Sequence, residues 1–512
     1  MTGQLYNFGV LLMVITTCGG IASASPSQTQ TLRVSHPKVG IVLDPHKMED
    51  AFSMAVVLQL YRGLMRYTPQ GESRPDLAES WTESTDHLRY VFKLKDANFS
   101  NGKPITAKNV QMSIARIFFL GASMGADLDY ITGVDGFRKS GDIGMLGVKP
   151  LSDSEIEFRL NKPSALFLKH LAVVDCAVLP IENYKEELAI SPASAFSGPY
   201  KLKKPLGDTG LELEKWRADP FDSANPPANI QILLSDEQPE ALARQGKTDS
   251  LDHERVAADS FTEFTKAGWK STATEIIAES FVILNPKKIA PELRQFLFAR
   301  VDSKELVRRI GANEFRPAFG LIPTGIAGEL REKECAELLR DPRAKVELSK
   351  PAHLEVEYDI GNAIHEKIVG YLSEVWKTPN LDIQFKGLSR KEKLARMFGK
   401  ESQACIGLKL LDYPDGFSVL TYFKSGYPGN YFHVENAAID SSINNLVNVF
   451  DESKRLSLYR DIQNSVLKQH TVVPLFFGTQ ASGLWGPKVK SVPSHPMGFH
   501  TLPYEMVEMK SL

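Results

Sequence analysis

The chain has 512 residues, of which 43% are hydrophobic and 24% charged, with a formal net charge of −2. A chain of this length is too long for one ordinary core, so two or three domains are expected. The composition is typical of a globular protein in water. The near-neutral charge argues against nucleic-acid binding, because there is no basic excess to neutralise phosphates.

The N-terminus has the pattern of an export signal. An apolar run over residues 8–15 is followed by small residues that end in ASA at 22–24. This A-x-A pattern predicts a signal peptide over residues 1–24 that is cleaved after its last alanine. The run is too short to span a bilayer. A lipid anchor at Cys18 is the alternative, although the residues before it match a lipobox poorly.

Cysteines are few and widely spaced. Cleavage of the signal would leave Cys176, Cys335 and Cys405, so at least one thiol is expected to be unpaired. Their spacing does not resemble that of a zinc site. We expect buried apolar residues with at most one disulfide.

Local signals define the first elements of the chain. Residues 32–43 predict a strand, and four apolar residues at helical spacing predict a helix over about 50–67. Alternating polar and apolar residues predict another strand over 88–94. Thr106 is expected to cap a helix that begins at the next residue.

A possible catalytic motif follows that helix. GASMG at 121–125 has the G-x-S-x-G form of a nucleophile elbow, with Ser123 as the candidate nucleophile. An elbow needs a strand before the serine and a helix after it. Here a helix precedes Ser123 and a loop is expected over 126–133, so the sequence argues against a serine hydrolase.

The second half of the chain alternates between helix and strand patterns. Asp302 and Glu305 predict a capping box for a helix. Residues 353–411 predict strand, helix, strand, helix and strand, and the last strand leads directly into DYPDG at 412–416. Ligands of open α/β sheets bind outside the carboxyl ends of the strands. Asp412 is therefore expected at a ligand-binding edge.

Three motifs carry a resemblance to a known family. LAESW at 77–81 precedes a strand that ends in FKL at 92–94, and F-x-x-G-x-P-x-T-A-x-x-V follows at 99–110. In this order they resemble the hallmark of the family 5 extracellular solute-binding proteins, the dipeptide-, oligopeptide- and nickel-binding components of bacterial ABC importers. Further matches, including SGPY at 197–200 and PTG at 323–325, extend the resemblance over most of the chain.

The resemblance implies an α/β fold with the two-lobe architecture of type II, cluster C-like periplasmic-binding proteins. Lobe I is expected to comprise residues 30–59, 172–275 and 480–512, with an inserted subdomain at 60–171. Lobe II is expected to comprise residues 276–479. The ligand is expected in a cleft between the lobes, which close on it about a hinge.

The resemblance also implies a function, that of a periplasmic substrate-binding protein of an ABC transporter. Such a protein captures a peptide or a related small polar solute and then docks on an ABC permease in the inner membrane. A monomer without cofactor, metal or enzymatic activity is expected. A sensory or chaperone-like binding protein that uses the same cleft without transport is the alternative.

Ligand-binding residues follow from the same resemblance. In peptide-binding members an aspartate in the loop that begins here with Asp412 and Tyr413 holds the α-ammonium group of the ligand, and Asp412 fits that position better than Asp415. The glutamate corresponding to Glu49 and the residues just after it, here including Ala51, lie along the bound peptide. A helix-capping role for Glu49 is the alternative.

One difference from the family bears on the ligand. Where the family usually has Gly-Trp before the binding loop, this chain has Leu408-Lys409, so an ammonium group replaces an indole in the expected pocket. Two explanations stay open: the ligand is anionic, or Lys409 neutralises Asp412. Peptides are the expected class of ligand, and sugars, opines and metal chelates are the alternatives.

Overall fold

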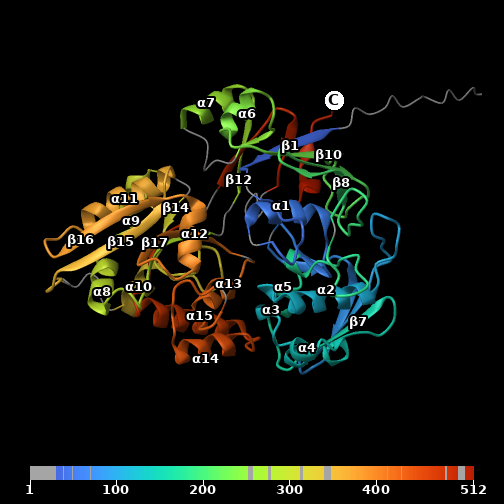
Figure 1. Cartoon of the computed structure of the whole chain (residues 1–512), viewed down its shortest axis with the longest axis horizontal. Helices are drawn as coiled ribbons and strands as arrows, with labels where there is room; N and C mark the ends of the chain where they lie inside the picture. Colours follow the sequence, from blue (N-terminus) through green and yellow to red (C-terminus); the bar gives the residue numbers. More distant parts are fainter. Residues whose placement is uncertain are drawn as a thin grey trace, which may run out of the picture.

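The structure is a computed structural model that describes residues 30–38, 40–48, 50–69, 71–188, 190–251, 258–274, 278–311, 315–339, 347–411, 413–427, 429–478, 481–493 and 502–511. None of the helices in these ranges is both long and apolar enough to cross a membrane. The ribbon has two lobes, one coloured blue to green together with the red C-terminal strands, and the other coloured yellow to orange-red (Figure 1).

The first lobe is built around a four-stranded sheet. Its strands are β1 (Thr31–His36), β10 (Asn229–Leu234), β9 (Gly210–Lys215) and β8 (Tyr200–Gly207), in that order. β1 and β10 are parallel and the other pairs antiparallel. The strand predicted over 32–43 ends at His36, because Pro37 has no N–H group to continue the ladder.

The helix predicted over 50–67 is shorter than expected. α1 spans Ala51–Leu60, and the next residue, Tyr61, is already extended. A Cβ on Gly63 would lie 3.2 Å from the carbonyl oxygen of Cys176, so a backbone from elsewhere in the chain packs against this point. Residues 65–67 form a strand instead, in the two-stranded pair of β2 (Met65–Tyr67) and β3 (Ser73–Pro75).

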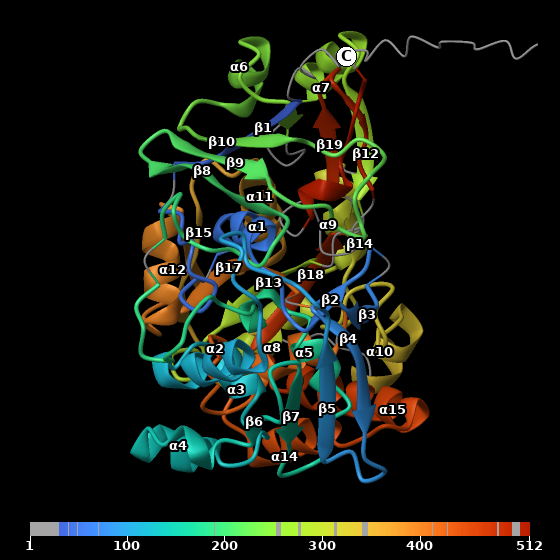
Figure 2. The same ribbon diagram turned by 90° about the vertical axis from the view of Figure 1, so that its right-hand side faces the viewer.

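A second four-stranded sheet lies at the opposite end of this lobe (Figure 2). Its order is β4 (Ala78–Glu83), β5 (Arg89–Leu94), β7 (Glu155–Arg159) and β6 (Val148–Pro150). The helices around it are α2 (Ala107–Leu120), α3 (Met124–Asp127), α4 (Val134–Ser140) and α5 (Phe167–His170). Thr106 caps α2 in a capping box with Asn109, as predicted.

Smaller elements complete this side of the molecule. A three-stranded sheet has the order β11 (Ser250–Leu251), β19 (Ala481–Trp485) and β12 (Lys270–Thr274). The remaining elements here are α6 (Pro239–Arg244), α7 (Ala258–Lys266) and the strand pair β20 (Val489–Ser491) and β21 (Glu508–Met509).

The second lobe contains a six-stranded mixed sheet. Its order is β14 (Phe315–Pro317), β18 (Val472–Gly478), β13 (Ala278–Leu284), β17 (Ala404–Leu410), β15 (Ala352–Asp359) and β16 (Leu381–Leu388). Its helices are α8 (Pro291–Ala299), α9 (Ser303–Ile310), α10 (Glu332–Leu339), α11 (Ala363–Val375), α12 (Arg390–Phe398), α13 (Phe417–Leu420), α14 (Ala437–Leu446) and α15 (Glu452–Leu467). The α/β pattern predicted for 353–411 is confirmed, and so is the cap of α9 by Asp302.

Strand β13 separates two hydrophobic cores. Val282 and Leu284 belong to a core within the second lobe. Phe281 and Ile283, which point to the other face, belong to a larger core that also includes residues of the first lobe. The lobes therefore share apolar contacts. Thr274 and Ala481 lie in strands of the first lobe, whereas Ala278 and Gly478 lie in strands of the second. The residue ranges assigned above to the lobes stay predictions.

Three cysteines lie in the described ranges, and all are unpaired. Cys176 and Cys405 are buried and Cys335 is partly buried. No disulfide therefore joins these three residues, and burial raises the pKa of the Cys335 thiol to about 11. The thiols of this chain are better described as small apolar side chains than as reactive groups.

Candidate ligand-binding site

Lys409 lies near the carboxyl end of β17, where the sequence places the ligand. Its side chain is half-buried. The ammonium group donates a hydrogen bond to the Tyr422 hydroxyl, and Nζ is 4.2 Å from the centroid of that ring. A cation over an aromatic face is attracted by the ring quadrupole. The residue that replaces the usual indole is thus itself held by an aromatic side chain.

Tyr413 connects the two lobes. It is buried, and its hydroxyl lies 3.1 Å from Nε2 of His170, the last residue of α5. Nδ1 of His170 lies 2.8 Å from the hydroxyl of Tyr130 in the first lobe. Burial lowers the pKa of His170 to about 4, so the imidazole is neutral at pH 7. One ring nitrogen therefore donates and the other accepts.

Asp415 makes a second contact between the lobes. Its Oδ2 lies 2.6 Å from Nζ of Lys169 on α5 and 2.8 Å from Nη2 of Arg455 on α15. The Tyr459 hydroxyl donates to its Oδ1. Burial alone would raise the pKa of Asp415, but the two cations hold it below the ordinary value. The sequence did not identify this residue as a lobe contact.

Other residues extend this contact along the second lobe. The backbone N–H of Ala165 donates to the carbonyl oxygen of Val447 at 2.9 Å. The rings of His87 and Phe450 stack with centroids 4.0 Å apart. In Figure 1, α5 of the first lobe lies next to α13 and α15 of the second. The lobes therefore touch over a broad boundary that includes the loop after β17.

Two of the predicted ligand-binding residues, Glu49 and Asp412, lie outside the described residues. Ala51 is the first residue of α1 and is half-buried. The cap of α1 is Asp50, whose Oδ1 accepts hydrogen bonds from the N–H groups of Phe52 and Ser53. The capping role considered for Glu49 is thus filled by its neighbour.

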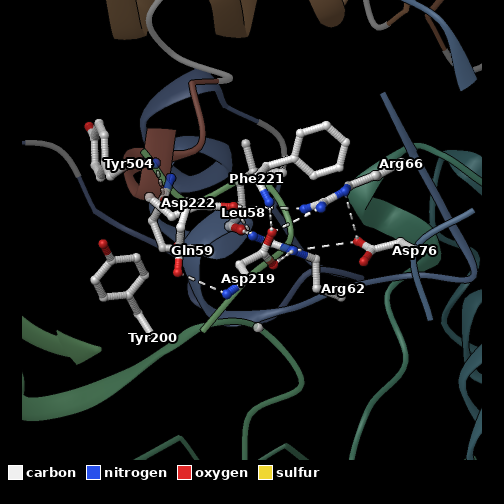
Figure 3. Close-up of polar contacts among 12 residues, drawn as sticks. Leu58, Gln59, Arg62, Arg66, Asp76, Tyr200, Asp219, Phe221, Asp222 and Tyr504 are labelled. Atoms are coloured by element: carbon white, nitrogen blue, oxygen red, sulfur yellow. Dashed lines mark hydrogen bonds and ion pairs between the residues drawn. The ribbon is translucent and has the colours of Figure 1, made fainter. Parts of the chain in front are cut away.

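A buried ion cluster fixes the element that carries Ala51 (Figure 3). Arg62, just after α1, pairs with Glu505 near the C-terminus and lies 3.4 Å from Asp76. Arg66 lies 2.9 Å from Asp219. Burial raises the pKa of Glu505, and Arg62 offsets part of this effect. The cluster connects the end of α1 to the loop that contains Asp219 and to the C-terminal segment that contains Glu505, and so holds α1 in place.

Ser123 does not have the geometry of a catalytic serine. It is exposed, and its φ of −54° and ψ of −41° are those of a right-handed helix. Helix α2 ends three residues before it, so no strand leads into it. A nucleophile elbow is a sharp, strained turn between strand and helix. The motif is a short helical connection.

Two α/β lobes that meet around the loop at the end of a sheet strand define a two-lobe binding protein. The chain belongs to the bacterial extracellular solute-binding proteins, family 5, whose model (described as the family's middle region) matches residues 72–431. The family of extracellular solute-binding proteins predicted from the sequence is thereby confirmed, together with an α/β fold.

Individual relatives agree with this assignment. The periplasmic oligopeptide-binding protein OppA of Escherichia coli K12 is 25% identical over 496 residues, which cover 90% of this chain and 89% of OppA. The murein tripeptide-binding protein MppA of Escherichia coli has the same fold, with a TM-score of 0.78 at 18% identity over 94% of this chain and 99% of MppA.

An open structure of MppA indicates how the lobes are arranged here. This unliganded open form gives a TM-score of 0.68, at 18% identity over 94% of this chain and 98% of that one. Sequence does not explain the lower score, because both comparisons involve MppA at the same identity. The lobe arrangement here is therefore closer to that of the first MppA structure, in agreement with the contacts between the lobes.

Proposed function

We propose that the protein captures a peptide, or a related small polar solute, between its lobes and delivers it to an ABC permease in the inner membrane. The observation that carries this proposal is the contact of the loop after β17 with the first lobe, through Tyr413 to His170 and Asp415 to Lys169. The loop in which the sequence places the ligand anchor thus takes part in closure.

Closure supplies the mechanism. An open form admits the solute, and the closed form contacts it from both lobes. Only the difference in affinity between the two forms drives the shift from one to the other. Capture of this kind needs no covalent step, and we propose that the protein is not an enzyme. The ion cluster around Arg62 keeps α1 rigid while the lobes move.

Within this proposal Asp412 holds the ammonium group of the solute, and Glu49 and Ala51 lie along its backbone. Lys409 provides a cation next to the anchor, held against Tyr422. Tyr413 fixes the loop by its hydrogen bond to His170. A charge-assisted hydrogen bond in a closed site is the strongest single anchor that such residues provide.

The first test replaces Asp412 with alanine. We expect tripeptide affinity to fall by at least about 30-fold, because truncating one partner of a buried charge pair costs about 2–5 kcal/mol. Titration calorimetry measures the affinity. Asp382→Ala, which changes an exposed carboxyl in the same lobe, serves as the control and should bind normally.

Two results would count against the proposal in different ways. Unchanged affinity in Asp412→Ala would remove this residue from the site. Wild-type protein that binds no peptide, and from which mass spectrometry recovers no co-purified solute, would contradict the function itself.

The pKa values predict how acid affects closure. Burial lowers the pKa of His170 to about 4. His170 therefore stays neutral at pH values below 6.5 at which an exposed histidine is already protonated. Closure should therefore weaken as the pH falls from about 6.5 towards 4. The pKa of Asp415 is also lowered, so its contribution is present above its ordinary value of 3.8 and is lost only in stronger acid.

X-ray scattering from pH 8 to pH 4 measures this dependence. We expect a constant radius of gyration between pH 8 and 7 and an increase below about 6.5. His170→Gln should remove the change between pH 6.5 and 4. If the radius of gyration of the wild type does not depend on pH, closure is not coupled to the protonation of His170.

A further inference from the structure

Glu279 is a buried carboxyl group that has no hydrogen-bond or ion-pair partner among the described residues. It is the second residue of β13, a strand in which every residue is buried, and its side chain is 2% exposed. Its Oε1 has no hydrogen-bond partner, and no ion pair forms between it and any described residue. Burial alone acts on the pKa of Glu279 and raises it well above the ordinary value.

Several other buried carboxylates among the described residues are paired with a cation. Asp44 lies 2.6 Å from Arg116, Asp415 lies 2.6 Å from Lys169, and Glu357 lies 2.6 Å from Arg396. Burying a polar group without a partner is unfavourable, and an apolar side chain in its place would be more stable. A buried glutamate that differs from these three carboxylates is therefore a candidate for a role in binding.

The strand register defines the neighbours of Glu279. Lys409 on β17 and Phe477 on β18 are directly opposite to it, so their side chains point to the same face of the sheet. Glu279 is thus next to the residue that replaces the indole of the family. It is also the second residue after the chain enters the second lobe from the first.

That face of the sheet belongs to the core that contains residues of both lobes. Phe281, two residues further along β13, points to the same side as Glu279. Its ring lies 4.9 Å from that of Phe432 and 6.4 Å from that of Tyr431, in the segment that follows the predicted ligand loop. Helices α8, α9 and α11 pack on the opposite face, around Val282 and Leu284, whereas α14 and α15 belong to the same core as Phe281.

Lys409 does not compensate the acid. Although it is opposite Glu279, its ammonium group lies over the ring of Tyr422 and donates to the hydroxyl of that residue. The two side chains form no ion pair with each other. On this face a basic ligand group would find an acceptor whose hydrogen-bonding capacity is unused.

We propose that Glu279 binds a basic group of the solute, an ammonium or a guanidinium, and that the protein therefore selects cationic peptides. This inference rests on the function proposed above. Burial favours the protonated form of Glu279 and a bound cation favours its carboxylate, so binding of the cation is expected to release a proton to solvent. The resulting contact is a charge-assisted hydrogen bond in a buried site. Asp412 remains the anchor proposed for the α-ammonium group.

The test compares two peptides that differ by one charge. Ala-Lys-Ala and Ala-norleucine-Ala have side chains of similar length, and only the first is cationic. Wild-type protein should bind the lysine peptide more tightly, by about tenfold or more. In Glu279→Gln this preference should disappear, while affinity for the norleucine peptide stays the same. Glu435→Gln, which alters an exposed carboxyl of the same lobe, should keep the preference.

Proton release provides a readout that a structural role would not change. Calorimetry in buffers of different ionisation enthalpy should show release of about one proton on binding of the lysine peptide at pH 7, and none in Glu279→Gln. Among the described residues, Lys409, Arg316, Tyr422 and Tyr431 are other titratable groups on this face, and Cys405 and Glu357 lie further along it. The glutamine variant separates Glu279 from them.

A leucine variant tests whether a loss of binding comes from a failure to fold. Without ligand, Glu279→Leu should be at least as stable to heat as the wild type, and it too should lose the lysine preference. Strong destabilisation by leucine, or a lysine preference that survives in either variant, would overturn the role of Glu279. If the wild type binds tripeptides without regard to charge, this inference fails while the proposed function stands. If it binds neither peptide, both fail.

Discussion

Replacing Arg62 with methionine is expected to lower the free energy of unfolding by about 3–5 kcal/mol, the range observed when one partner of a buried ion pair is removed. The guanidinium group is 4% exposed and faces Glu505, Asp76 and Asp219. Burial disfavours its charge, but these three carboxylates together raise the pKa of Arg62 above its ordinary value. Methionine has a similar length but leaves the carboxylates uncompensated.

Urea denaturation followed by circular dichroism measures this effect. Arg74→Met is the matched control, because Arg74 pairs with Glu72 at 2.7 Å while its side chain is 60% exposed. A surface pair of this kind contributes at most about 1 kcal/mol. Equal, small losses in the two variants would contradict the view that the cluster supports α1 and the C-terminal segment.

Replacing Asp415 with asparagine is expected to weaken closure of the lobes. The substitution removes the charge that holds Lys169 of the first lobe, and it also deprives Arg455 of its partner. Lys169 is 34% exposed, so solvent screens the pair and we expect about 1–2 kcal/mol from the contact between the lobes. Peptide affinity should then fall by about 10-fold or slightly more.

Two measurements separate closure from local damage. Titration calorimetry should show the loss of affinity, and X-ray scattering should show a larger radius of gyration in the presence of peptide. Lys169→Met removes only the partner in the first lobe and should reproduce most of both changes. If Lys169→Met binds like the wild type, the ion pair does not contribute to closure, and the effect of Asp415→Asn arises within the second lobe.

Elements defined by neighbours in sequence were predictable. The cap of α2 by Thr106 and the cap of α9 by Asp302 depend on residues two or three positions away. The alternation over 353–411 likewise depends on local periodicity. Helix caps and hydrophobic periodicity can be predicted because each depends on residues within a single element.

Elements limited by distant partners were not predictable. The helix predicted to reach residue 67 ends at Leu60, where the backbone near Cys176 packs against Gly63. A segment far away in sequence decided this boundary, and no local pattern contains that information. The strand predicted to reach residue 43 ends at His36 for a local reason, because Pro37 has no N–H group to continue the ladder.

The sequence by itself determined the family, the two-lobe α/β fold and the strand end at which Lys409 and Tyr413 lie, since these follow from motifs and local periodicity. Only the tertiary structure decided which charges are paired. Asp415 finds Lys169 across 246 positions, whereas Glu279, in a run of buried strand residues, finds no partner among the described residues. Pairing depends on which strands and lobes come together, and folding alone sets those distances.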